Sequence, residues 1–192
     1  MSLPIGVLAL QGDFREHIAA VERLGETTLS VRTAADLAKV RALIIPGGES
    51  TTIGKLARIF DVFDPIQKAI SSGLPVFGTC AGLIMLADRI VGGIEGQETF
   101  GGLDVTVARN AFGNQLDSFE ADLEFSGLDH PVHAAFIRAP IITDVGSASV
   151  RSTLSDGRVV AVSQENVLGI SFHPEVTGED GVHRLFIEEF VK

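Results

Sequence analysis

The sequence has few of the features that mark membrane, secreted or nucleic-acid-binding proteins. Its single cysteine, Cys80, permits no internal disulfide, which fits the reducing cytoplasm. No apolar run approaches the roughly 18 residues that a membrane helix needs, and no signal peptide is predicted at the N-terminus. The 15 Lys and Arg residues are scattered among 25 Asp and Glu residues, and the formal net charge is -10. These features predict no binding to nucleic acid or to an anionic membrane.

The order of the apolar segments predicts one α/β domain across residues 1–192. The first half alternates predicted strands at 5–10, 27–31, 42–45 and 74–77 with predicted helices at 16–24, 53–58, 65–71 and 81–87. Such alternation is typical of a mostly parallel sheet with helices on both faces. In the second half, strands are predicted at 103–108, 118–123, 148–154, 159–163 and 168–172, before a closing helix at 182–191. We expect these later strands to extend the same sheet, partly antiparallel.

The segment Gly78-Thr79-Cys80-Ala81-Gly82 predicts a nucleophilic cysteine. A buried strand precedes Cys80 and a helix follows it, with glycine two residues away on either side. This is the pattern of a sharp strand–turn–helix corner that exposes a nucleophile above the end of its strand. The helix N-terminus also favours the thiolate form. A buried structural cysteine is the alternative, which the glycine spacing disfavours.

A second strand end carries a candidate base and its partner. His173 and Glu175 follow an apolar segment, two residues apart. If this stretch is extended, both side chains point to one side, and the carboxylate orients the imidazole. We interpret His17, His130, His133 and His183 as structural or solvated. No histidine or cysteine cluster has the spacing of a metal site, so no metal is expected.

The glycine-rich loop at 46–52 is a candidate oxyanion hole. The Ala81 N–H supplies one donor for a developing oxyanion, and Gly48 in this loop supplies the second. The loop also resembles a phosphate-binding loop, but Leu56 stands after Lys55 where that motif needs Ser or Thr. An ordinary turn with a Ser or Thr helix cap is a further alternative.

Together these segments resemble the class I glutamine amidotransferases, whose triad is Cys, His and Glu. The closest likeness is to the glutaminase subunits of pyridoxal 5′-phosphate synthase. It is carried by segments 10–12, 46–52, 78–82, 109–113, 117–120, 136–140 and 171–175. The triad pattern is shared by many amidotransferases, whereas Gly-Gly-Glu-Ser-Thr-Thr at 47–52 and Phe-Ile-Arg-Ala-Pro at 136–140 point to the vitamin B6 branch.

The resemblance implies a flavodoxin-like three-layer fold and glutamine hydrolysis by Cys80, His173 and Glu175. It further implies a glutamine site made by Gly48, Glu49, Ser50, Arg109, Ile137 and Arg138. The expected partner is the catalytic subunit of the synthase, in a hetero-oligomer that receives the ammonia. No cofactor is expected in this chain.

Three alternatives stay open on the sequence alone. A glutaminase for histidine or purine synthesis would carry the same triad. A related group of cysteine hydrolases usually has its histidine directly after the nucleophile, a place that Ala81 fills here. A non-catalytic homologue is disfavoured because all three triad positions are occupied.

Overall fold

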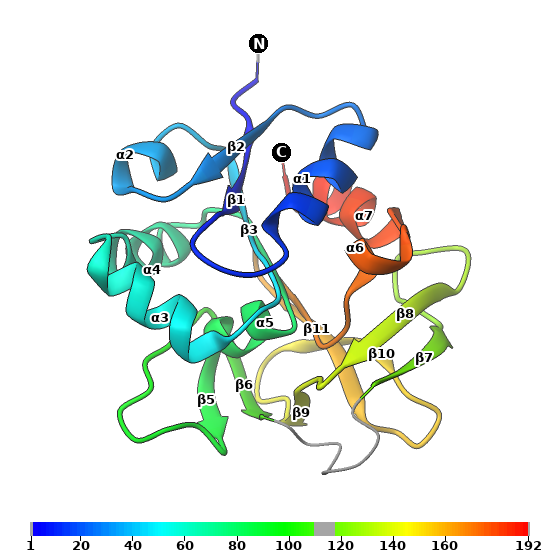
Figure 1. The fold of residues 1–192 in the computed structure, drawn as a ribbon. Coiled ribbons are helices and arrows are strands. Elements are labelled where there is room, and N and C mark those ends of the chain that lie inside the picture. The colour runs from blue at the N-terminus through cyan, green and yellow to red at the C-terminus, as the bar shows by residue number, and fades with distance from the viewer. Residues whose placement is uncertain (1, 110–117, 192) are drawn as a thin grey trace.

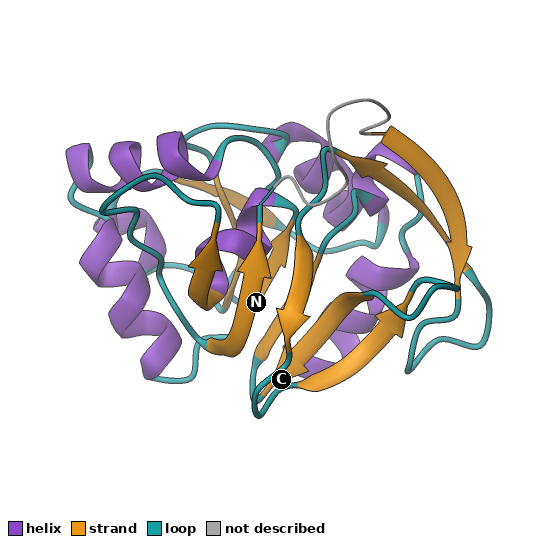
Figure 2. Cartoon of the chain, turned by 90° about the horizontal axis from the view of Figure 1, so that it is seen from below, coloured by secondary structure: helices purple, strands orange, loops and turns teal. Residues whose placement is uncertain are grey.

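The computed structural model describes residues 2–109 and 118–191, which form three layers (Figures 1 and 2). Residues 110–113 and 117, which contribute to the family resemblance, lie outside the described residues. The central layer is a ten-stranded sheet, and helices lie on both of its sides. The predicted α/β class with a mixed, mostly parallel sheet is confirmed.

Parallel strands make up the half of the sheet built from the first part of the chain. β2 (Thr28–Val31), β1 (Ile5–Leu8), β3 (Ala42–Ile45), β4 (Val76–Thr79) and β12 (Val167–Ile170) lie side by side in that order. Each neighbouring pair among them is parallel. The segments that leave β4 and β12 at their carboxyl ends therefore meet at one edge, where open α/β sheets hold their ligands.

Antiparallel pairing continues the sheet beyond β12. The next strands are β11 (Val159–Gln164), β9 (Ile141–Asp144), β6 (Leu103–Ala108) and β5 (Ala87–Val91), with β10 (Ser149–Thr153) paired to β11. β5 and β6 are parallel to each other. The predicted, partly antiparallel extension is therefore present.

Two hydrophobic cores separate the layers. α3 (Ser50–Ile59), α4 (Phe63–Ser71) and α5 (Ala81–Leu86) pack on one face, and α1 (Phe14–Arg23) and α7 (Gly181–Phe190) pack on the other (Figure 1). β3 divides its side chains between them: Leu43 and Ile45 enter the first core, and Ala42 and Ile44 the second. The short helices are α2 (Ala34–Leu37) and α6 (Pro174–Thr177). No helix in the described ranges has both the length and the apolarity of a membrane span.

Several predictions about the elements were wrong. The segment 118–123 forms β7 (Ser118–Leu123), but among the described residues it pairs only with β8 (Val132–Ile137), in a separate two-stranded sheet. His133 lies in β8, a strand that the sequence pattern did not predict. It contacts Asp122 Oδ1 at 2.8 Å and Glu120 Oε2 at 3.1 Å across the pair. β5 and β9 were also missed, and the predicted helix at 81–87 ends one residue earlier, because Ala87 already has extended angles.

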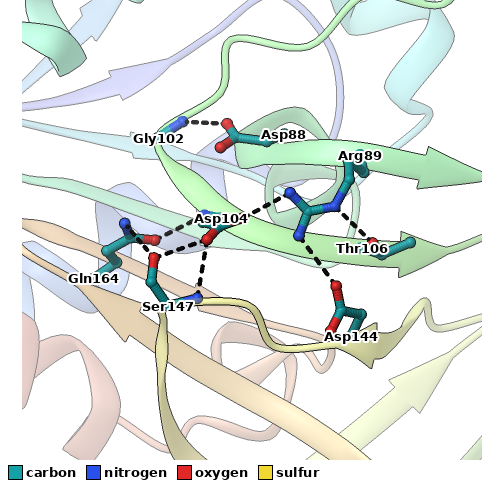
Figure 3. A network of polar contacts seen from close by, with 8 residues as sticks. All are labelled: Asp88, Arg89, Gly102, Asp104, Thr106, Asp144, Ser147 and Gln164. Carbon is teal, nitrogen blue, oxygen red and sulfur yellow. Dashed lines mark hydrogen bonds and ion pairs between the residues drawn. The ribbon is translucent and has the colours of Figure 1, made fainter.

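A polar network holds the far edge of the large sheet together (Figure 3). Arg89 on β5 donates to Asp104 Oδ1 at 2.6 Å and to Thr106 Oγ1 at 2.9 Å on β6. Ser147 donates to the other oxygen of Asp104 from its backbone N–H and its hydroxyl. The hydrogen bond from Arg89, followed by those from Ser147, lowers the pKa of Asp104 to about 2. On this edge, ionised groups on the exposed face add to the apolar packing of β5 and β6 on the buried face.

Candidate active site

Cys80 occupies a strained corner between β4 and α5. Its φ of 48° and ψ of -103° place it in the positive-φ region that L-residues rarely enter. A Cβ on Gly82 would lie 2.1 Å from the backbone oxygen of Ile45, so only glycine lets α5 pack this closely against β3. The first N–H groups of a helix have no partner within it, so the Ala81 N–H at the start of α5 is placed to serve an oxyanion. The predicted corner is confirmed.

His173 lies beside Cys80 and is held from two sides. Its backbone N–H donates to the carbonyl of Ala135 on β8 at 2.9 Å. Its Nδ1 contacts Glu175 Oε1 at 2.7 Å. Glu175 does not sit in an extended segment as expected; it lies in the first turn of α6, which Pro174 opens. The turn brings the carboxylate back to the imidazole, so the pairing survives although the predicted geometry was wrong.

Charge in this cluster favours a protonated imidazole. Burial alone would lower the pKa of His173, but the hydrogen bonds with Cys80 and Glu175 outweigh it and raise the pKa to about 10. Burial raises the pKa of Glu175, and the bond from His173 opposes that rise. The imidazole is thus held beside the sulfur of Cys80, an arrangement that suits a cysteine nucleophile and its base.

A cavity of about 520 Å³ opens over these groups. All six residues predicted to bind glutamine line it: Gly48, Glu49, Ser50, Arg109, Ile137 and Arg138. Cys80 and His173 line it as well, while Glu175 is buried and does not. The structure thus brings together the predicted nucleophile, the predicted base and the predicted substrate residues from both halves of the chain.

The loop at 46–52 is held by its own polar groups. The side chain of Glu49 caps α3 by accepting from the N–H groups of Thr51 at 3.0 Å and Thr52 at 2.7 Å. The cap is therefore a glutamate, not the Ser or Thr weighed as an alternative. Burial would raise the pKa of Glu49, but these hydrogen bonds lower it to about 2. The Gly47 carbonyl accepts from the Asp13 N–H at 3.1 Å, which fixes the peptide before Gly48.

Arg109 reaches the cavity from beyond β6 and binds the same loop. It donates to Glu49 Oε1 at 3.0 Å, and to Gln97 Oε1 at 2.6 Å. Gln97 in turn donates to Ser50 Oγ at 3.0 Å. Arg138, on the opposite wall, has a φ of 44°, a second strained residue at the cavity.

Sequence reasoning missed two residues at or beside this cavity, Gln97 and Asp13. Gln97 carries no local signal, because its contacts with Arg109 and Ser50 join loops far apart in the chain. Asp13 follows β1 at the same sheet edge, a position that could have drawn attention; its Oδ2 lies 3.6 Å from His173 Nδ1. His17, interpreted as structural or solvated, is fully buried, which agrees with the structural interpretation.

Asp13, His173 and Glu175 bring potential metal-ligand atoms within 4.8 Å of one another. The histidine atom in this group, Nδ1, already holds Glu175 at 2.7 Å. A cation bound there would break that pairing and leave the imidazole without its orienting carboxylate. The geometry therefore suits a hydrogen-bonded base better than a metal ligand.

Comparison with known proteins agrees with this geometry. Residues 7–192 match the model of the SNO glutamine amidotransferase family. Proteins named pyridoxal 5′-phosphate synthase subunit PdxT are 57% identical in Clavibacter michiganensis and 54% identical in a Nocardioides species; each match covers 96% of this chain, and 89% and 94% of the relative. A crystal structure described as a glutamine amidotransferase is 50% identical, with a TM-score of 0.90, covering 96% of this chain and 97% of that one. This chain belongs to the SNO glutamine amidotransferase family.

Proposed function

We propose that this chain is the glutaminase subunit of a pyridoxal 5′-phosphate synthase, acting as a single amidotransferase domain over residues 1–192. It hydrolyses L-glutamine to L-glutamate and ammonia. The observation that carries the proposal is the set of Cys80, His173 and Glu175 in hydrogen-bonding order beside a cavity lined by two arginines. The names of the relatives supply the pathway.

In the first half-reaction, the Cys80 thiolate attacks the side-chain amide carbon of glutamine. The carbonyl oxygen becomes an oxyanion, which the N–H groups of Ala81 and Gly48 stabilise. The tetrahedral intermediate collapses as its C–N bond breaks. Protonated His173 gives its proton to the departing nitrogen, which leaves as ammonia, and a thioester remains on Cys80.

In the second half-reaction, water replaces the lost amine. Neutral His173 takes a proton from the water as it attacks the thioester carbon. The C–S bond then breaks, which releases glutamate and restores the thiolate beside the imidazolium. Glu175 keeps the imidazole in one orientation and stabilises its charge in both halves.

Charge complementarity supports a free amino acid as the substrate. Glutamine presents an α-carboxylate and an α-ammonium besides its amide. Arg109 and Arg138 offer donors for the carboxylate, and the ionised Glu49 offers acceptor oxygens for the ammonium. Ser50 and the Ile137 segment complete the walls between them.

The partner is the synthase subunit that consumes ammonia, in a hetero-oligomer. Ammonia released into bulk water would be protonated and lost to the reaction, so direct transfer between subunits suits the chemistry. A nucleophilic thiolate also fits a reducing compartment, and we place the protein in the cytoplasm.

Ammonia release from L-glutamine, with and without the catalytic synthase subunit, tests this function. The wild-type complex should release ammonia, and Cys80→Ala should lower the rate by at least about 1,000-fold because no other side chain can form the thioester. Circular dichroism of the variant checks that it folds. Wild-type turnover in Cys80→Ala would contradict the nucleophile. Ammonia transfer only to a synthase of histidine or purine synthesis would contradict the pathway.

A further inference from the structure

A buried pair of histidines continues the row of catalytic groups into the protein. His17 on α1 and His183 on α7 are both fully buried. His17 Nδ1 lies 2.8 Å from His183 Nε2, and His17 Nε2 lies 3.1 Å from the hydroxyl of Thr79. Thr79 directly precedes Cys80. His17 Nε2 also lies 3.6 Å from Glu175 Oε2.

The contact between His17 and Glu175 involves the outer carboxylate oxygen, Oε2. Oε1 is bound to His173, whereas Oε2 is buried and has no hydrogen-bond partner among the described residues. A buried carboxylate oxygen left without a donor is costly and leaves the side chain free to rotate. His17 Nε2 faces that oxygen at a distance which a small rotation would shorten to a hydrogen bond.

The contacts of His183 select the tautomer of His17. Within residues 2–109 and 118–191, His183 Nδ1 has no hydrogen-bond partner. A buried N–H without an acceptor is disfavoured, so the proton of His183 belongs on Nε2, where it donates to His17 Nδ1. The proton of His17 then lies on Nε2 and points toward Thr79 and Glu175. The opposite arrangement would aim a lone pair at a carboxylate.

We propose that His17 is a positioning residue for Glu175, holding its outer carboxylate oxygen while His183 fixes the tautomer that makes this possible. This inference rests on the proposed role of the triad. Through Glu175, His17 keeps the His173 imidazole aligned with Cys80. His17 touches neither the cavity nor the reacting atoms.

His17 acts as a neutral dipole rather than as a charge. Burial, followed by repulsion from His183 and His173, lowers the pKa of His17 well below its usual 6.5. The titratable groups facing the pair are His173 and Glu175 on one side, and Asp180 and Arg23 beside His183. A charged His17 would repel the His173 imidazolium, so the neutral form is the one that assists.

His17→Leu and His17→Gln in the full chain test the proposal. Leucine removes the donor, whereas glutamine places an N–H near the same point. We expect His17→Leu to lower kcat about 10- to 100-fold with KM within twofold, and His17→Gln to restore most of the loss. Alkylation of Cys80 by iodoacetamide should shift to higher pH in His17→Leu only.

Phe186→Leu is the matched control, because it truncates a buried ring that packs at 5.5 Å against Phe77 near the same helix. It should lower stability but leave kcat and the alkylation profile unchanged. An equal loss in Phe186→Leu, or wild-type values in His17→Leu, would overturn the proposal. If His17→Leu does not fold, His183→Phe carries the test: it should lower kcat and shift the alkylation profile, and wild-type values there would overturn the proposal. Wild-type protein without glutaminase activity would instead contradict the proposed function, since alkylation requires no glutamine.

Discussion

At the scale of single residues, the arginines of the cavity differ in how they are held. Arg109 is fixed by Glu49, Gln97 and Thr51 before any substrate arrives. Such an arrangement limits the side-chain entropy that a long residue loses on binding a carboxylate. Arg138 instead relies on a strained backbone that aims it from the end of β8. The two cations therefore reach the cavity by different means.

We expect Arg109→Gln to raise KM for glutamine about 10- to 100-fold with kcat within threefold. The reason is the loss of a charge-assisted hydrogen bond, worth roughly 1.5–3 kcal/mol, at a site away from the reacting bond. Steady-state glutaminase kinetics with the synthase partner measure it. Arg41→Gln is a matched control, since Arg41 is similarly half-buried and ion-paired, to Glu26. An unchanged KM in Arg109→Gln would remove Arg109 from the glutamine site.

At the scale of elements, the local sequence pattern predicted those strands whose boundaries depend on nearby residues. The apolar and alternating runs at 42–45, 103–108 and 118–123 match β3, β6 and β7 to the residue. β9 pairs with β6, a strand far along the chain that no local window contains, whereas β8 pairs with β7 directly before it and was missed although its partner is close. Cys80, His173 and Glu175 could be proposed as nucleophile, base and orienter because each belongs to a short motif. Gln97 and His17 could not, because their contacts exist only after folding.

The helix after the nucleophile gives a prediction at this scale. We expect Gly82→Ala to destabilise the protein by about 1–3 kcal/mol and to lower glutaminase activity, because the new Cβ would push α5 away from Ile45 and tilt Cys80. Urea unfolding and ammonia release measure the two effects.

Gly54→Ala is the control for that substitution. Gly54 lies in α3, and a Cβ added there would lie 3.6 Å from the Met85 side chain, an ordinary van der Waals distance. Removing a helical glycine should stabilise the protein by about 0.5–1 kcal/mol and leave activity intact. Equal effects of the two substitutions would show that close packing of α5 is not needed at the corner.

At the scale of the whole molecule, the buried histidines make the free energy of unfolding depend on pH. Burial lowers the pKa of His183 to about 4, against 6.5 for an exposed histidine. Between these two pH values His183 is protonated in the unfolded chain but neutral in the folded protein. The free energy of unfolding therefore falls as the pH drops from about 6.5 toward 4. The difference is about 3 kcal/mol for this residue over the whole window.

Urea unfolding of the wild type and of His183→Phe at pH 6.5 and pH 5 measures the contribution of His183 to this pH dependence. The wild type should lose about 2 kcal/mol more than the variant, since other groups titrate in both. Parallel losses in the two proteins would mean that His183 takes up its proton without unfolding.

The small sheet of β7 and β8 stands apart from the main sheet, yet it serves two tasks there. Its Ala135 carbonyl anchors the backbone of His173, the proposed general base, and the residues at the end of β8 form a wall of the cavity. Displacement of the β7–β8 sheet would release the backbone of His173 and open this wall of the cavity at the same time. Affinity for glutamine and the rate of turnover should therefore fall together whenever this small sheet moves away from the main one.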